Sequence, residues 1–237
     1  MSCPVLDASS AQSIDECIKY GFFQLAIDQE HQQLIVDVLD EMKHFFGQDV
    51  SVKEMEQRTN DGLGYYRGTN VSKESLSYRY GNNDIYNKYM DIMAIYSSKV
   101  LDAILSYFKT SLPCSIILPT LHLVHYPEQA DGPKVGIAEH SDWGYLTLLV
   151  TTAEGLEVEK DGVYTPISPM SSYFIVNIGD MLSRLTGGQA KATRHRVINQ
   201  HEKYSIVYFY EPGLNVTIDG IMFADYLKIK LASQNEI

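Results

Sequence analysis

The sequence predicts a mainly β domain, built as a sandwich or barrel, with helices flanking it in the first half of the chain. Apolar residues recur at helical spacing before residue 117, and from Leu118 onward short apolar runs alternate with Gly, Pro and Asp turns. The 237 residues, 45% of them hydrophobic, suffice for one large core. We therefore expect a single domain over residues 1–237, with a mostly helical part over 1–117 and a β core over 118–220.

The first half contains three helix patterns, each preceded by a residue that can cap it. Ser9 or Ser10 precedes the first pattern, Asp28 the second, and Asn83 or Asp84 the third. The expected elements are a strand near residues 5–6, a helix ending near residue 20, a strand over 22–27, and helices over 29–46 and 85–111. The polar stretch from residue 58 to 83 predicts irregular structure, and a loop of this length often serves as a lid.

The second half contains eight short strand patterns separated by turn residues. They lie at 119–126, 135–138, 145–150, 155–159, 173–178, 195–199, 204–210 and 215–218. We expect these strands to form the sheets of the β core, with the long helix before them packed on the outside of a sheet.

The composition argues against several classes of protein. A formal net charge of −11 and a pI near 5.0 oppose binding to nucleic acid, which needs a basic surface. We expect no transmembrane span, because no stretch is long and apolar enough, and no signal peptide. The three scattered cysteines, Cys3, Cys17 and Cys114, suggest the reduced thiols of a cytoplasmic protein.

Two histidines and an aspartate form a candidate metal site. His140 and Asp142 stand two residues apart just before an apolar run, and residues i and i+2 of an extended chain point to the same side. A strand end can therefore aim both side chains at one metal ion. His195 is the expected third ligand. Two imidazoles and one carboxylate on one face of an octahedron are typical of non-haem Fe(II) oxygenases.

Further motifs extend the pattern along the chain in a fixed order. They are Pro4-Val5-Leu6-Asp7, Gly21-Phe22-Phe23, Tyr126-Pro127, the His140 to Leu149 block, Gly155-Leu156-Glu157-Val158, Val176-Asn177-Ile178-Gly179-Asp180, His195-Arg196-Val197 and Tyr204-Ser205-Ile206. With them the sequence resembles the isopenicillin N synthase-like family of Fe(II)/2-oxoglutarate-dependent oxygenases. The resemblance implies a double-stranded β-helix, or jelly roll, in which His140, Asp142 and His195 bind Fe(II). It also implies that 2-oxoglutarate and O2 are used to oxidise, by default to hydroxylate, a small organic substrate.

The resemblance further indicates where the cosubstrate binds. In the family, an arginine and a serine two residues apart hold the far carboxylate of 2-oxoglutarate, and this chain has Lys203 and Ser205 there. Lysine supplies a point charge where arginine offers a planar fork. Tyr126 is retained as a candidate hydroxyl donor to the cosubstrate, whereas Val124 replaces the asparagine that many of these enzymes have.

Because both departures fall on one subsite, three interpretations of the function stay open. The leading one is a 2-oxoglutarate-dependent oxygenase. The second is an Fe(II) and O2 oxidase of the same fold that does not use 2-oxoglutarate, and the third is a non-catalytic, ligand-binding jelly roll. Lys203 has the alternative role of an exposed turn lysine beside Glu202.

Two more places are candidates for contact with the substrate or the barrel interior. Tyr65, Tyr66 and Arg67 belong to a Gly-Tyr stretch comparable to one that lies beside the substrate pocket in the family, although a surface turn is the alternative. His122 shares a strand face with Tyr126 and can face the interior. For His122 we favour the role of a hydrogen-bonded core histidine.

Overall fold

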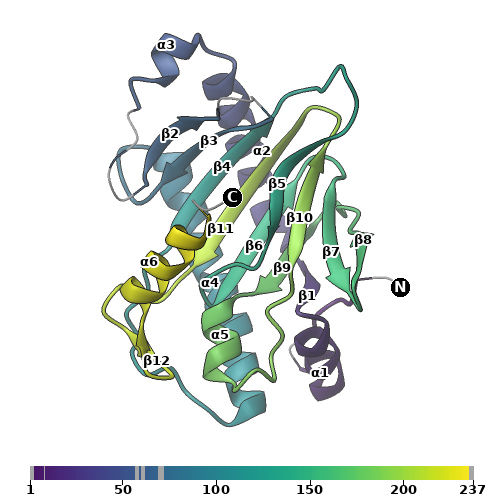
Figure 1. Cartoon of the computed structure of the whole chain (residues 1–237), viewed down its shortest axis with the longest axis vertical. Helices are drawn as coiled ribbons and strands as arrows, with labels where there is room; N and C mark the ends of the chain where they lie inside the picture. The colour runs from purple at the N-terminus through teal and green to yellow at the C-terminus, as the bar shows by residue number, and fades with distance from the viewer. Residues whose placement is uncertain (1–2, 8, 57–58, 60–61, 69–71, 235–237) are drawn as a thin grey trace.

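The computed structural model contains two antiparallel sheets that face each other, and it describes residues 3–7, 9–56, 59, 62–68 and 72–234. The larger sheet has the strand order β1-β9-β6-β11-β4-β3-β2, and the smaller one has the order β5-β10-β7-β8. In Figure 1 the smaller sheet lies in front of the larger one. This arrangement confirms the predicted mainly β fold, a double-stranded β-helix.

The strands are short and are joined by tight turns or by helices. Their bounds are β1 Phe22–Ala26, β2 Gly64–Arg67, β3 Glu74–Tyr78, β4 Thr120–Tyr126, β5 Lys134–His140, β6 Leu146–Thr151, β7 Leu156–Lys160, β8 Val163–Pro166, β9 Tyr173–Ile178, β10 His195–Asn199, β11 Lys203–Tyr210, β12 Thr217–Ile218 and β13 Ile221–Met222. The last two form a separate pair. Each strand pattern expected in the second half corresponds to one of these strands.

The helices lie mainly behind and below the sheets (Figure 1). Their bounds are α1 Ala11–Tyr20, α2 Gln29–Phe46, α3 Val50–Lys53, α4 Asp84–Phe108, α5 Asp180–Leu185 and α6 Phe223–Gln234. Two of the predicted caps are confirmed. The Ser10 side chain accepts a hydrogen bond from the Ser13 amide, and the Asn83 side chain accepts from the amides of Ile85 and Tyr86.

The larger sheet has one face against the helices and one face toward the smaller sheet. On the helix side, Leu123 of β4, Leu148 of β6 and Ile206 of β11 are fully buried in the same apolar cluster as Met42 of α2 and Met93 of α4. Because successive residues of a strand point to opposite faces, their neighbours in the sequence face the interior between the sheets. The helices therefore cover one face of the sheet, while its other face remains available for a site.

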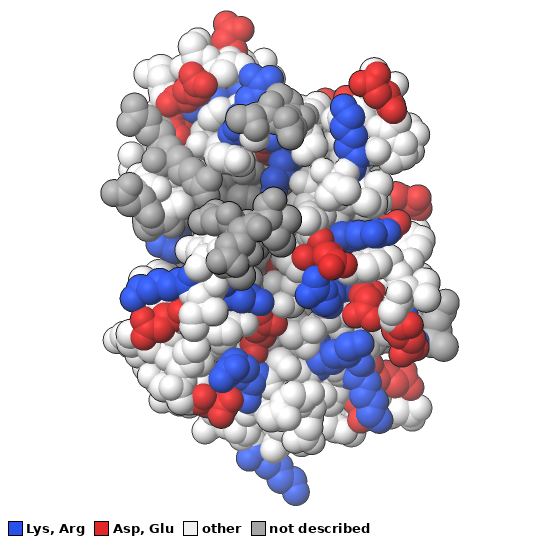
Figure 2. Space-filling model, in the orientation of Figure 1, with Lys and Arg blue, Asp and Glu red and all other residues white. Residues whose placement is uncertain are grey.

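The outer face of the smaller sheet is polar and carries charges of both signs. Arg196 of β10 pairs with Glu157 of β7 at 2.7 Å, and Arg194 pairs with Glu139 of β5 at 2.9 Å. Figure 2, which views the molecule from this side, shows acidic and basic side chains interspersed over the surface. The sheet thus has one face suited to water and one face directed at the interior.

Two strands in the first half of the chain differ from the sequence-based expectation. Within the stretch 58–83, expected to be irregular, β2 and β3 pair with each other and β3 pairs with β4, although residues 58, 60–61 and 69–71 lie outside the described residues. The mostly helical part over 1–117 thus supplies β1, β2 and β3 to the larger sheet. Polar strands with little alternation are recognised only through their partners, which explains the wrong prediction for 58–83.

Candidate metal centre and its cavity

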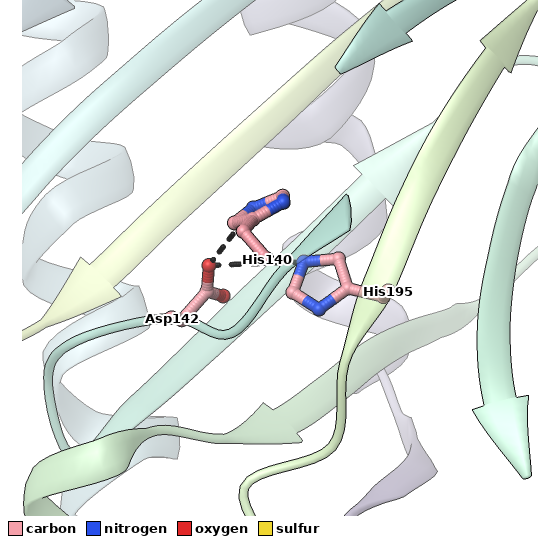
Figure 3. A group of neighbouring side chains, drawn as sticks. All are labelled: His140, Asp142 and His195. Carbon is pink, nitrogen blue, oxygen red and sulfur yellow. Dashed lines mark ion pairs between the residues drawn. The ribbon is translucent and has the colours of Figure 1, made fainter. Parts of the chain in front are cut away.

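His140, Asp142 and His195 converge on one point between the sheets. His140 ends β5, His195 begins β10, and the two residues are paired across the smaller sheet. Asp142 follows His140 by two residues. One ligand atom from each residue lies within 4.8 Å of the other two, and Figure 3 shows the three side chains turned toward one another. The structure therefore brings together the three residues that the sequence indicated as metal ligands.

Hydrogen bonds fix which ring nitrogen of each histidine faces the aspartate. His140 Nδ1 lies 2.9 Å from the Ala138 carbonyl oxygen, and His195 Nδ1 lies 3.3 Å from that of Thr193. A carbonyl only accepts, so both Nδ1 atoms carry the proton and donate it. Both Nε2 atoms then face Asp142 Oδ1, at 3.5 Å from His140 and 3.7 Å from His195. This tautomer is the one that a metal-ligating histidine needs.

The second oxygen of Asp142 is held by two donors from the larger sheet. Asp142 Oδ2 accepts hydrogen bonds from Thr147 Oγ1 at 2.5 Å and from Asn177 Nδ2 at 2.7 Å. Oδ1 is therefore the oxygen directed at the histidines. Burial by itself would raise the pKa of Asp142, but His195, His140 and the Thr147 hydrogen bond lower it well below its ordinary value. The carboxylate is thus ionised and oriented as a metal ligand should be.

Two nitrogen donors and one carboxylate oxygen can occupy one face of the coordination sphere of a divalent first-row metal. The coordination positions on the opposite face then stay open. That donor set suits Fe(II) in the facial arrangement of non-haem oxygenases. His195 is nearly buried and has the Phe22 ring edge-on at 5.1 Å between centroids, whereas His140 is more exposed. Access to the site is therefore from the His140 side.

The triad opens into a cavity between the two sheets. Apart from the triad, the lining residues are Phe22, His122, Val124, Tyr126, Ile137, Thr147, Leu149, Thr151, Leu156, Asn177, Val197, Lys203, Ser205, Val207 and Phe209. Apolar side chains make up much of this wall, so the cavity suits a small organic molecule rather than a polymer.

Lys203 lies at the other end of this cavity and is almost fully buried. Its ammonium donates to the carbonyl oxygens of Glu154 at 2.9 Å and Ile198 at 3.2 Å, and lies 4.9 Å from the Tyr126 ring centroid. Among the residues that the structure describes, no carboxylate lies within ion-pair distance of it. Burial lowers the pKa of Lys203 to about 8. A buried ammonium with only neutral partners still has its charge uncompensated, so an anion could bind there.

The comparisons with known proteins agree with this geometry. A model of the 2OG-Fe(II) oxygenase superfamily matches residues 118–212. This segment of the chain is therefore similar to the superfamily. The matched segment begins just before β4 and ends just after β11, so it contains all three ligands of the triad as well as Lys203 and Ser205.

Curated relatives and solved structures extend the match. The chain is 39% identical over 105 residues to the 2-oxoglutarate-dependent dioxygenase citB of Monascus ruber, an alignment that covers 40% of this chain and only 32% of that protein. It is 26% identical over 264 residues to gibberellin 2-beta-dioxygenase 3 of Arabidopsis thaliana, covering 91% and 77% of the two chains. The structure of a full-length Neurospora crassa protein in complex with alpha-KG and 5-formyluracil superposes with a TM-score of 0.83 at 22% identity, covering 95% and 90%.

The remaining residues singled out in the sequence lie in different surroundings. Ser205 lines the cavity, and its hydroxyl lies 3.1 Å from Thr151 Oγ1. Tyr126 also lines it and is 2% exposed. Tyr65 is buried and donates its hydroxyl to Glu74 at 2.5 Å, whereas Arg67 is exposed on β2. Neither Tyr65 nor Arg67 lines the cavity.

One alternative for Lys203 is wrong, and three supporting residues were not predicted. Lys203 is not an exposed turn lysine, because its side chain is 2% exposed and reaches toward the turn before β7. Thr147 and Asn177 hold Asp142, and both lie inside motifs that carry the resemblance to the family. Gly155 makes room for the lysine, since a Cβ there would lie 2.2 Å from Lys203 Nζ. The sequence showed these residues but not their contacts.

The helices around the two sheets differ from membrane spans. Across the described part of the chain, none combines the length and the apolar character that crossing a bilayer requires.

Proposed function

We propose that this protein is an Fe(II)- and 2-oxoglutarate-dependent dioxygenase that oxidises, most simply by hydroxylation, a small organic substrate. The observation that carries the proposal is the pairing of two features in one cavity. One is the convergence of two Nε2 atoms and one carboxylate oxygen, and the other is a buried ammonium at the opposite end. The names of the relatives, among them the dioxygenase citB, support the same activity.

The residues of the chain have distinct roles in this proposal. His140, Asp142 and His195 hold the metal on one face, and Thr147 and Asn177 keep the aspartate oriented. When bound, the iron and 2-oxoglutarate together supply the oxidising chemistry. The apolar wall of the cavity excludes bulk water from the reacting groups.

Lys203 and Ser205 would bind the far carboxylate of 2-oxoglutarate. At pH 7 most protein molecules carry a protonated Lys203, because its pKa of about 8 lies above that pH. The ammonium would give up no ion pair to receive the anion, and the Ser205 hydroxyl lies on the same face of β11. Lysine can thus replace the arginine of the family as a point charge, with less geometric constraint.

The domain and the compartment are part of the same proposal. We treat residues 1–237 as one domain, because strands from both halves of the chain pair in the larger sheet. The three cysteines are free, which supports a reducing, cytoplasmic compartment.

An anaerobic titration of the Fe(II)-loaded protein with 2-oxoglutarate tests the cosubstrate directly. We expect a weak visible charge-transfer band that grows to saturation in the wild type and is lost in Lys203→Ala. Lys134→Ala is the matched control, because Lys134 is an exposed lysine on β5. Bound iron without a band would favour the oxidase that does not use 2-oxoglutarate. Failure to bind iron would favour the non-catalytic jelly roll.

A further inference from the structure

A second hollow lies beside the active-site cavity, at the end of strand β6. Its walls come from the first half of α2, from the last residues of β6, and from residues 169–172 of the loop that leads into β9. Leu149 and Thr151 line both the hollow and the active-site cavity. A single layer of side chains therefore separates the two spaces.

The hollow lies where the pairing of the larger sheet is incomplete. β6 pairs with β11 up to Thr151, which is opposite Ser205. On its other edge β6 pairs with β9 only up to Leu149, which is opposite Ile175. The end of β6 thus has a strand on one side and the hollow on the other, and the side chains of Leu149 and Thr151 are only partly buried.

The lining of the hollow is neutral. Apolar side chains such as Ile27 and Ile35 form much of its wall, and its polar groups are hydroxyls and an amide, among them Ser171 and Gln32. None of the described residues that line it is charged at pH 7. A charged ligand would lose its hydration there without gaining an ion pair, whereas a small apolar molecule gains by leaving water.

The shared wall lies along the middle of the active-site cavity. Leu149 is two residues from Thr147, whose hydroxyl holds Asp142, so the Cα atoms of Leu149 and Thr147 lie roughly 7 Å apart at ~3.3 Å per residue. Thr151 lies at the opposite end, where its hydroxyl is 3.1 Å from that of Ser205. A molecule that crosses this wall therefore arrives near the metal centre.

The proposed function brings three small molecules into one cavity. 2-Oxoglutarate would extend from the triad to Lys203, and the substrate would enter from the side of His140, the more exposed of the two histidines. O2 has to reach the metal after both are bound. The hollow approaches the cavity from another direction, through Leu149 and Thr151.

We propose that this hollow is the entry route for O2, which passes between Leu149 and Thr151 into the active-site cavity. This inference rests on the proposed function and adds a path for one of its substrates. O2 is small, neutral and apolar, so the lining favours it over the anionic cosubstrate. Its passage requires only rotamer changes of partly buried side chains, which are fast.

Relaxation of methyl protons by dissolved O2, which is paramagnetic, tests the route without turnover. We would load the triad with Zn(II), add 2-oxoglutarate, and compare methyl relaxation under O2 and under argon. The methyl groups of Ile35 and Leu149 should be relaxed more strongly by O2 than those of Leu148 and Ile206, which are fully buried on the helix side of the sheet.

Variants that fill the hollow decide from which side O2 reaches Leu149. Val36→Trp on α2 and Met170→Trp on the loop each place an indole in the hollow from an exposed position, which leaves the core unchanged. Both should reduce the effect of O2 on Leu149 to the level of Leu148. Ile95→Trp is the matched control, because Ile95 is 48% exposed, close to the 47% of Val36, but lies on α4 outside the hollow.

A kinetic measurement completes the test. The rate at which the charge-transfer band of the Fe(II) and 2-oxoglutarate complex decays on mixing with O2 should fall in both filling variants and stay unchanged in Ile95→Trp. The affinity for 2-oxoglutarate should be the same in all three. If neither filling variant changes the relaxation of Leu149, O2 enters from the His140 side and the route is refuted. If the wild type binds neither metal nor 2-oxoglutarate, the proposed function is wrong, and this inference with it.

Discussion

Substitution of Lys203 by methionine should stabilise the protein while abolishing cosubstrate binding. Lys203 is 2% exposed. Within the described part of the chain, its ammonium donates hydrogen bonds to two backbone carbonyls and forms no ion pair. Burial lowers its pKa from 10.5 to about 8. This shift means that folding destabilises the ammonium, relative to the neutral amine, by at most about 3 kcal/mol. Methionine has a similar length and carries no charge to bury.

The net gain is smaller than this upper limit. The carbonyls of Glu154 and Ile198 each lose a donor, at about 1 kcal/mol per hydrogen bond. We therefore expect the metal-free variant to unfold with a free energy about 1 kcal/mol higher than the wild type at pH 7. Urea unfolding followed by far-UV circular dichroism measures this difference.

The stability difference between the wild type and Lys203→Met should change with pH, and the direction of that change tests the reasoning. Between pH 8 and 10.5 the unfolded wild type binds more protons at Lys203 than the folded protein does, because the folded pKa is the lower one. The stability of the wild type should therefore rise with pH relative to that of Lys203→Met, and the advantage of the variant should disappear. A difference that is constant from pH 7 to 10, or a variant less stable at pH 7, would refute the account of a buried, uncompensated charge.

Three more substitutions follow from the contacts of the site and of the sheet. Asn177→Leu removes one of the two donors to Asp142 Oδ2 and should weaken Fe(II) binding about 10- to 100-fold, measured by competition with a chelator. Gly155→Ala places a Cβ 2.2 Å from the lysine ammonium at a backbone φ of +123°, and should cost about 3 kcal/mol of stability and weaken the binding of 2-oxoglutarate. Glu74→Gln leaves the buried Lys53 ammonium without its carboxylate partner at 2.8 Å, and should cost about 3–5 kcal/mol while leaving metal affinity unchanged.

Each of these predictions has an outcome that contradicts it. Unchanged Fe(II) affinity in Asn177→Leu would mean that Thr147 alone orients the carboxylate. A Gly155→Ala protein with normal stability and normal 2-oxoglutarate affinity would show that the lysine can shift at no cost. A Glu74→Gln protein that loses metal binding together with stability would show that the cluster around Glu74 is coupled to the metal centre through the sheet.

The sequence alone could place those parts of the site that are local in the chain. His140 and Asp142 are two residues apart, as are Lys203 and Ser205, and the alternation of an extended chain determines that each pair shares a face. Capping residues such as Ser10 and Asn83 act over three residues and were likewise predictable. The fold class followed from the change to short strand patterns after residue 118.

Contacts between distant segments were decided by the tertiary structure. His195 meets His140 because β10 pairs with β5, and Asn177 reaches Asp142 because β9 lies beside β6. The strands β2 and β3 have no clear apolar alternation of their own, and their partners in the larger sheet stabilise them. No local pattern encodes such pairings.

The burial of Lys203 shows the same limit at a single residue. In the sequence it stands beside Glu202 and is compatible with an exposed turn, but in the fold its side chain reaches across the cavity toward Gly155. Whether a lysine is solvated or buried depends on what the opposite sheet places above it, and that is a property of packing between segments. The sequence thus determined the donor types and their local spacing, whereas the tertiary structure determined which atoms meet and how strongly each charge is desolvated.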